Sequence, residues 1–244
     1  AKARWQILMA AVLCSAAIVG LVFLLGNGPT VLSFITQQSD RGLQVEAPVS
    51  TPWLWLAFAG QRHAHVYYDR GMLTYQVTGD GSAAVSALMT PLLAFVVLAL
   101  VLLAVLAARR GATVVELFPT LALALVTSFI AFNKVGSPQY MAWLAVPIIL
   151  GLVVSNGRHE RPFRVPAGIT AVLAALTQLI FPWFYDELLA LNPVLLVLLT
   201  ARNLLLFVLL GWAVMALCDS ARERSGNALQ HERLEPDTQT TWER

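Results

Sequence analysis

The chain has 244 residues, of which 58% are hydrophobic and 12% are charged, and its net charge at pH 7 is +2. A mean hydropathy of +0.69 excludes a water-soluble globular protein, and so small a net charge gives no reason to expect nucleic acid as a partner. The sequence has no H-E-x-x-H, C-x-x-C or glycine-rich phosphate loop, which argues against a zinc hydrolase, a P-loop protein and a dinucleotide-binding enzyme.

Six continuous apolar stretches are long enough, or nearly so, to cross the hydrocarbon core of a membrane as helices. They are residues 5–26, 86–107, 113–132, 140–155, 165–184 and 194–218. The first stretch is longer than the apolar core of a usual signal peptide, so we expect a membrane span there too. The pattern predicts an all-α multi-pass membrane protein with about six transmembrane helices.

Lysine and arginine residues indicate the orientation, because cytoplasmic loops carry an excess of them. With six spans drawn, one side holds Lys2, Arg4, Arg109, Arg110, Arg158, Arg161, Arg164, Arg222, Arg224, Arg233 and Arg244, and the other holds only Arg41, Arg62, Arg70 and Lys134. We therefore expect both ends of this chain to lie in the cytoplasm.

The longest polar interruption, residues 27–85, is expected to form a structured cap on the outer side. Pro29 suits the first turn of a helix, and the apolar residues after it predict a short amphipathic helix in the membrane interface. Residues 53–59 form a second apolar piece, whose aromatic residues suit the headgroup region. Two β-type runs, residues 65–68 and 73–78, predict a hairpin.

The polar end of the chain, residues 219–244, has too few apolar residues to build a core of its own. We expect it to be a disordered cytoplasmic tail that follows a transmembrane region of residues 1–218. Cys14 and Cys218 lie within or at the end of apolar stretches and are interpreted as structural residues.

The first candidate site lies in residues 39–46 of the outer segment, where Asp40, Arg41, Gln44 and Glu46 occur close together. An arginine can hold a phosphate with two hydrogen bonds, and a carboxylate can deprotonate a hydroxyl. The alternative is a set of solvated interfacial residues that form weak local ion pairs.

The second candidate site is the turn between the third and fourth apolar stretches, on the same side. Lys134 could neutralise a lipid phosphate, and Ser137, Gln139 and Tyr140 could contact a sugar or headgroup. The alternative is an ordinary loop with a snorkelling lysine and an interfacial tyrosine.

Arg202 lies inside the last apolar stretch, where a charge costs a few kcal/mol unless it faces protein, water or a partner. A buried, phosphate-facing role is one explanation. The others are snorkelling to the outer surface and pairing with Asp186 or Glu187.

Three stretches carry a resemblance to a known family. Asp40-Arg41-Gly42-Leu43-Gln44-Val45-Glu46 is similar to a D-R-G-L-Q-I-E motif, residues 134–144 are similar to a K-V-x-S-P-Q-Y-x-x-W-L loop, and residues 177–182 match T-Q-x-x-F-P with Tyr185 following. In this order and spacing they resemble the actinobacterial glycosyltransferases of family 87, which use polyprenyl phosphate sugars and belong to the GT-C superfamily.

The resemblance implies transfer of a sugar, typically mannose or arabinose, from a polyprenyl phosphate donor to a glycolipid or polysaccharide acceptor of the cell envelope. It also implies a multi-pass protein of the plasma membrane that acts at the outer face of that membrane. Arg41, Lys134 and Arg202 would face the phosphate of the donor, with Gln44, Ser137, Gln139 and Tyr140 as further donor contacts. Asp40 or Glu46 would act as the catalytic base. No cofactor or metal site is expected, and the use of a divalent metal is left open.

Family members are commonly longer, and they carry an essential carboxylate in an early outer loop. We therefore expect this chain to correspond to their C-terminal part, with Asp40 and Glu46 in supporting roles. Two further interpretations stay open, a lipid or small-solute transporter and a non-catalytic membrane subunit. The sequence shows no paired halves of the kind common in transporters, which favours the enzyme.

Overall fold

A computed structural model describes residues 2–25, 41–154 and 162–234, and the chain divides into two units, residues 1–41 and 42–244. The amphipathic helix expected after Pro29 lies outside the described residues, and so does Asp40. The first unit contains helix α1, Lys2–Leu25. Its apolar side chains, such as Val12 and Leu24, are exposed within that unit, which suits a helix surrounded by lipid.

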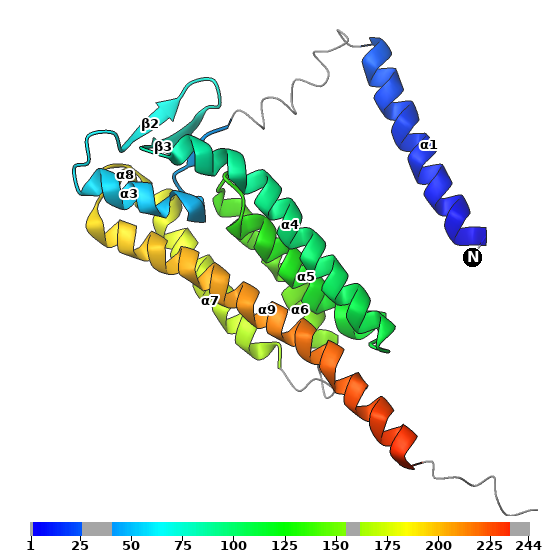
Figure 1. Cartoon of the computed structure of the whole chain (residues 1–244). Helices are drawn as coiled ribbons and strands as arrows, with labels where there is room; N and C mark the ends of the chain where they lie inside the picture. The colour runs from blue at the N-terminus through cyan, green and yellow to red at the C-terminus, as the bar shows by residue number, and fades with distance from the viewer. Residues whose placement is uncertain (1, 26–40, 155–161, 235–244) are drawn as a thin grey trace, which may run out of the picture. The chain divides into compact units, whose positions relative to one another are not determined.

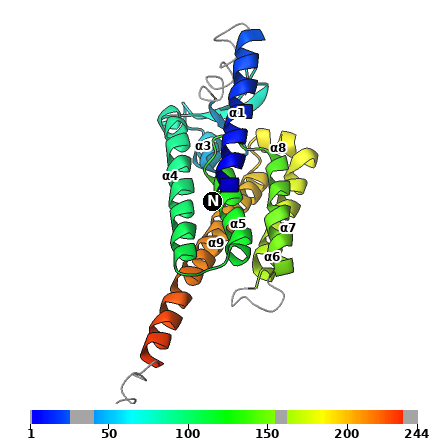
Figure 2. The ribbon, with the colours of Figure 1, turned by 90° about the vertical axis from the view of Figure 1, so that its right-hand side faces the viewer.

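The second unit contains a bundle of long apolar helices (Figure 1). They are α4 (Ser82–Arg109), α5 (Val114–Ala131), η3 (Pro138–Leu144) running into α6 (Ala145–Val154), α7 (Arg164–Gln178) running into the π-helical turn η4 (Leu179–Trp183), and α9 (Pro193–Leu234). Helices α5 and α9 pack on each other, with α4 on one side of the pair and α6 and α7 on the other (Figure 2).

Four helices are long and apolar enough to cross a membrane: Ser82–Arg109, Val114–Ala131, Arg164–Trp183 and Pro193–Ala221. The first and fourth predicted spans form shorter apolar helices, Met9–Leu25 and Pro138–Val154. The prediction of a helical membrane protein is therefore confirmed, whereas the count of six spans stays a prediction.

Local sequence accounts for the start of α5. The Thr113 side chain accepts a hydrogen bond from the Glu116 backbone N–H, and the Glu116 carboxylate accepts one from the Thr113 N–H at 3.0 Å, which is a capping box. Gly111 has a φ of 97° and makes the turn that precedes it, a conformation that glycine adopts without strain.

Helix α9 differs from the prediction at its end, because it continues past Cys218 to Leu234. Residues 219–234 are therefore helical here, residues 235–244 lie outside the described part, and the disorder of the tail stays a prediction. This segment is rich in Ala, Arg, Glu, Gln and Leu, which favour helix. Because the apolar helix before it is already formed, each further residue adds a hydrogen bond without a new nucleation step.

The cap, defined here as residues 42–81, lies at one end of the bundle (Figure 1). It contains the strands β1 (Leu43–Gln44), β2 (His65–Asp69) and β3 (Thr74–Thr78) in the antiparallel order β1-β3-β2. Strands β2 and β3 are joined by a turn, so the predicted hairpin is confirmed. The side of the membrane on which the cap lies stays a prediction.

A helix fills the second apolar piece of the cap. After the 3-10 turn η2 (Pro48–Ser50), helix α3 (Thr51–Phe58) packs against α9, and the Trp55 indole N–H donates to Thr200 Oγ1 at 3.0 Å. Leu54 points into this contact and is fully buried. The piece therefore packs on protein, and its position relative to lipid headgroups stays a prediction.

Two groups of buried apolar side chains hold the second unit together. The larger lies within the bundle and includes Leu123, Leu144, Leu173 and Leu206. The smaller joins the cap to α8 (Tyr185–Leu189) and the first turns of α9, and includes Leu43, Val77, Leu188 and Leu196. One face of the sheet therefore rests on the helices.

Gly151 of α6 lies against the buried ring of Phe163, and a methyl group added there would overlap the ring. We expect Gly151→Ala to lower the free energy of unfolding by about 1–3 kcal/mol, because the ring has no space to move into. Thermal unfolding in detergent micelles measures the effect. Gly168→Ala on α7 is the matched control, since nothing lies within 4 Å of its added methyl. Equal melting temperatures for the two variants would contradict the packing described.

Candidate functional site

The first two candidate stretches meet through the backbone. The Gln44 N–H, on β1, donates to the Lys134 carbonyl at 3.0 Å, and the Val45 N–H donates to the Tyr75 carbonyl at 3.2 Å. Strand β1 thus lies between the hairpin and the turn that follows α5. Residues 90 positions apart in the sequence become neighbours here.

Gly136 permits this close approach. A Cβ atom at this position would overlap the backbone of Glu46 and would lie 2.9 Å from the Ala47 Cα. Since the obstacle is backbone rather than a movable side chain, only glycine fits. The turn of residues 133–137 is also held from within, because Asn133 Oδ1 accepts from the Val135 N–H at 2.9 Å.

Arg202 links α9 to Glu46, which follows strand β1 in the cap. Its Nη2 donates to the Glu46 backbone carbonyl at 2.5 Å and to Asn203 Oδ1 at 2.8 Å, and its Nε donates to Asn203 Oδ1 at 3.1 Å. Asn203 Nδ2 in turn donates to Thr51 Oγ1 at 2.9 Å. The charged group is 2% exposed, so the cap and α9 together enclose the guanidinium.

The Glu46 side chain completes this buried network. It is 6% exposed, accepts a hydrogen bond from the Tyr185 hydroxyl and is attracted by the charge of Arg202. Burial raises the pKa of Glu46 above its usual value, against the opposing effects of Tyr185 and Arg202. The pKa of Tyr185 is raised by its own burial and by the nearby Glu46 charge, so this phenol stays protonated and donates.

These contacts decide between the interpretations of Arg202 and Lys134. Arg202 neither snorkels nor pairs with Asp186 or Glu187, because its hydrogen bonds go to Glu46 and Asn203. Lys134 is 5% exposed and is therefore no snorkelling loop lysine. Both cations lie inside the protein where the cap meets the bundle.

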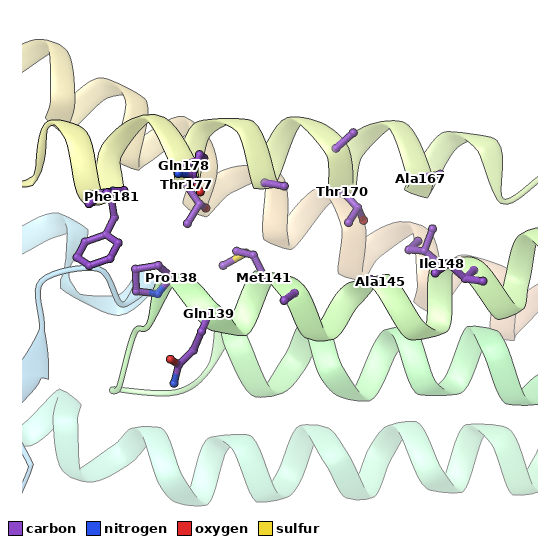
Figure 3. Close-up of a pocket in the computed structure, with 15 residues that line it drawn as sticks. Pro138, Gln139, Met141, Ala145, Ile148, Ala167, Thr170, Thr177, Gln178 and Phe181 are labelled. Carbon is purple, nitrogen blue, oxygen red and sulfur yellow. The ribbon is translucent and has the colours of Figure 1, made fainter.

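A cavity of about 650 Å³ opens beside this network, between η3 and α6 on one side and α7 and η4 on the other (Figure 3). Its end near the cap is formed by Pro138 and Gln139 together with Thr177, Gln178, Phe181 and Pro182. Figure 3 shows Phe181, Thr177 and Thr170 extending from one side toward Pro138 and Met141 on the other. The second and third candidate stretches therefore meet at the end of one cavity nearest the cap, and this end is called the cavity mouth below.

The remainder of the cavity is apolar. Most of its lining consists of small or aliphatic side chains: Ala142, Ala145, Ile148, Ile149, Ala167, Ala171 and Ala174. It runs along the helices for several turns, away from the cap (Figure 3). Such a space suits an extended hydrocarbon chain better than a polar solute.

The structure does not bring every predicted site residue to the cavity. Arg41 is the last residue of the first unit, so the position of Arg41 relative to the second unit is not described. Asp40 lies outside the described residues. Glu46, Lys134 and Arg202 do not line the cavity. Ser137 ends the turn before η3, and Tyr140 stacks on Trp143 with ring centroids 4.5 Å apart.

Sequence reasoning missed the partners of Arg202. Asn203 and Thr51 hold the guanidinium in place, and Tyr185 holds Glu46. One signal was present, since a polar Arg-Asn pair within an apolar helix must find partners. Nothing in the sequence identified Thr51 of the cap or Tyr185 of α8 as members of this network.

Among residues 2–25, 41–154 and 162–234, no three His, Cys, Asp or Glu side chains lie close enough together to hold a metal ion. Comparison with known proteins adds no assignment: no family model, no curated protein and no solved structure matches the chain.

The Glu46–Arg202 pair provides a test of the buried network. We expect Glu46→Gln and Arg202→Met each to lower the free energy of unfolding by about 3 kcal/mol, because each leaves a buried partner uncompensated. The double variant should lose less than the sum of the two, with a coupling of about 1–3 kcal/mol. Denaturant titration in detergent micelles measures all four proteins. Additive losses would refute the pairing, and Glu187→Gln should show no coupling to Arg202→Met.

Proposed function

We propose that this protein is a membrane glycosyltransferase, or the donor-binding part of one, that moves a hexose such as mannose from a polyprenyl phosphate to an acceptor at the outer face of the plasma membrane. One observation carries the proposal. The described parts of all three stretches that resemble the family 87 enzymes converge at one end of the bundle, although they are separated by up to about 140 residues.

The geometry supplies the two environments that such a donor needs. Its hydrocarbon chain requires a long apolar slot, which the cavity between α6 and α7 offers. Its phosphate requires positive charge at the polar end of that slot. We assign that charge to Lys134 and Arg202, the two cations buried where the cap meets the bundle, although neither lines the slot itself.

In the transfer, an acceptor hydroxyl oxygen forms a bond to the anomeric carbon while the bond from that carbon to the phosphate oxygen breaks. The polyprenyl phosphate leaves with the bonding electrons, and the hydroxyl proton passes to a carboxylate. We assign this base to Asp40 or to a carboxylate elsewhere in the full-length protein. Glu46 lies next to Tyr185 and Arg202 and acts as a positioning residue that keeps Arg202 in place.

The donor phosphate gives the first functional test. In membranes that contain the full-length gene product, Lys134→Met should reduce sugar release from a radiolabelled polyprenyl phosphate donor at least about tenfold, because the leaving phosphate loses a cation. Arg70→Met is the control, since Arg70 is exposed in the hairpin turn. Full activity of Lys134→Met would refute the phosphate site. Movement of the intact donor across the membrane without sugar transfer would favour a transporter.

The cavity gives a second test, through one pair of neighbouring residues. Ala171 lines the cavity, whereas Val172 is 48% exposed and is not part of the lining. We expect Ala171→Phe to raise KM for a long-chain polyprenyl donor at least about tenfold, since the new ring fills the slot. Val172→Phe adds a similar ring on the outer face and should leave KM unchanged. Equal KM values for both variants would show that the chain binds elsewhere.

A further inference from the structure

A row of four aromatic rings leads from the hairpin to the mouth of the cavity. Tyr68 on β2 and Tyr75 on β3 are cross-strand neighbours whose ring centroids lie 5.0 Å apart. Tyr75 contacts Tyr185 at 6.1 Å, and Tyr185 contacts Phe181 at 5.4 Å. Phe181 also lines the cavity (Figure 3). Tyr68, Tyr75, Tyr185 and Phe181 are called the aromatic row below.

The row is open at both ends. Tyr68 is 46% exposed and Phe181 is 41% exposed, while Tyr75 and Tyr185 are half-buried between them. Tyr68 lies on the same face of the sheet as Tyr75, Val77 and Leu43, which pack on the helices. It remains exposed because β2 is the outer strand of the sheet. Rings from four separate elements, β2, β3, η4 and α8, therefore form a partly open surface.

The chemistry of this surface selects its ligand. A hydrocarbon chain would need no hydroxyl groups, and nucleic acid would need cations along its backbone. The row instead combines flat apolar ring faces with phenol hydroxyls at their rims. A pyranose has the complementary surface, with C–H groups on its faces and hydroxyls around its edge.

We propose that the aromatic row is the acceptor subsite, which binds an oligosaccharide chain and leads its terminal hydroxyl toward the sugar phosphate at the cavity mouth. This inference rests on the proposed function and names the acceptor class of that same site. Two features of the row carry it: its continuity with the cavity through Phe181 and the exposed ring of Tyr68 at its far end.

The test measures binding without a donor. The full-length protein in lipid nanodiscs is titrated with mannotetraose, and saturation-transfer NMR reports contact with the protein. We expect saturable binding that Tyr68→Leu weakens at least about tenfold and that Tyr68→Phe weakens less, because the flat ring makes most of the contact and the hydroxyl adds a hydrogen bond.

Tyr67→Leu is the matched control. Tyr67 is the adjacent residue on the opposite face of β2, and its hydroxyl donates to Gln76 Oε1 at 3.0 Å. The control therefore disturbs the hairpin at least as much as Tyr68→Leu does, yet it should leave mannotetraose binding unchanged.

Three results would overturn the subsite: no saturable binding by the unaltered protein, equal loss in the two leucine variants, or binding of an extended peptide along β2 in place of the oligosaccharide. Because no donor is present, these failures leave the transferase proposal intact. Mannotetraose binding without any sugar transfer by the unaltered protein would instead refute the transferase proposal and leave a saccharide-binding row.

Discussion

The buried charge of Arg202 is the constraint on which the rest of this architecture depends. An arginine in the apolar part of a helix is stable only if its hydrogen bonds and charge are satisfied. Here Asn203 satisfies part of that need from the same helix, and the Glu46 carbonyl and carboxyl satisfy the rest from the cap. The cap is therefore docked on α9 by a polar requirement as well as by apolar packing, and its position is specific.

Docking of the cap also arranges the elements around it. Glu46 binds Tyr185 at the start of α8, Gln44 binds the turn after α5, and Trp55 binds Thr200 on α9. Each contact ties a different helix to the same short stretch of chain. The cavity mouth is lined by residues of η3, which follows the turn after α5, and of η4, which precedes α8. A substitution in the buried network should therefore change the shape of the cavity even though the substituted residue does not line it.

The site separates an apolar compartment from a charged one. The slot between α6 and α7 carries small aliphatic side chains, while the two buried cations, Lys134 and Arg202, lie at the cap. A lipid-linked sugar has the same division, with its hydrocarbon chain on one side of the phosphate and its sugar on the other. The aromatic row extends the arrangement by a third compartment, which suits the acceptor. The proposed reaction then takes place where the three compartments meet.

Much of the fold follows from local patterns. Apolar runs predicted the membrane helices, and the alternating runs around Arg70-Gly71 predicted the hairpin. The isolated charge of Arg202 indicated that it must face protein, water or a partner, without selecting one of them. These features depend on neighbours within a few residues. The extension of α9 to Leu234 was not predicted, because a polar segment can extend a helix that is already formed. The pairing of Arg202 with Glu46, 156 residues away, was not predictable, since asparagine, carboxylate and backbone carbonyl elsewhere in the chain were equally suitable partners. Packing of the cap on α9 selected among them, and the same packing brought Phe181, Tyr185 and the hairpin into one row.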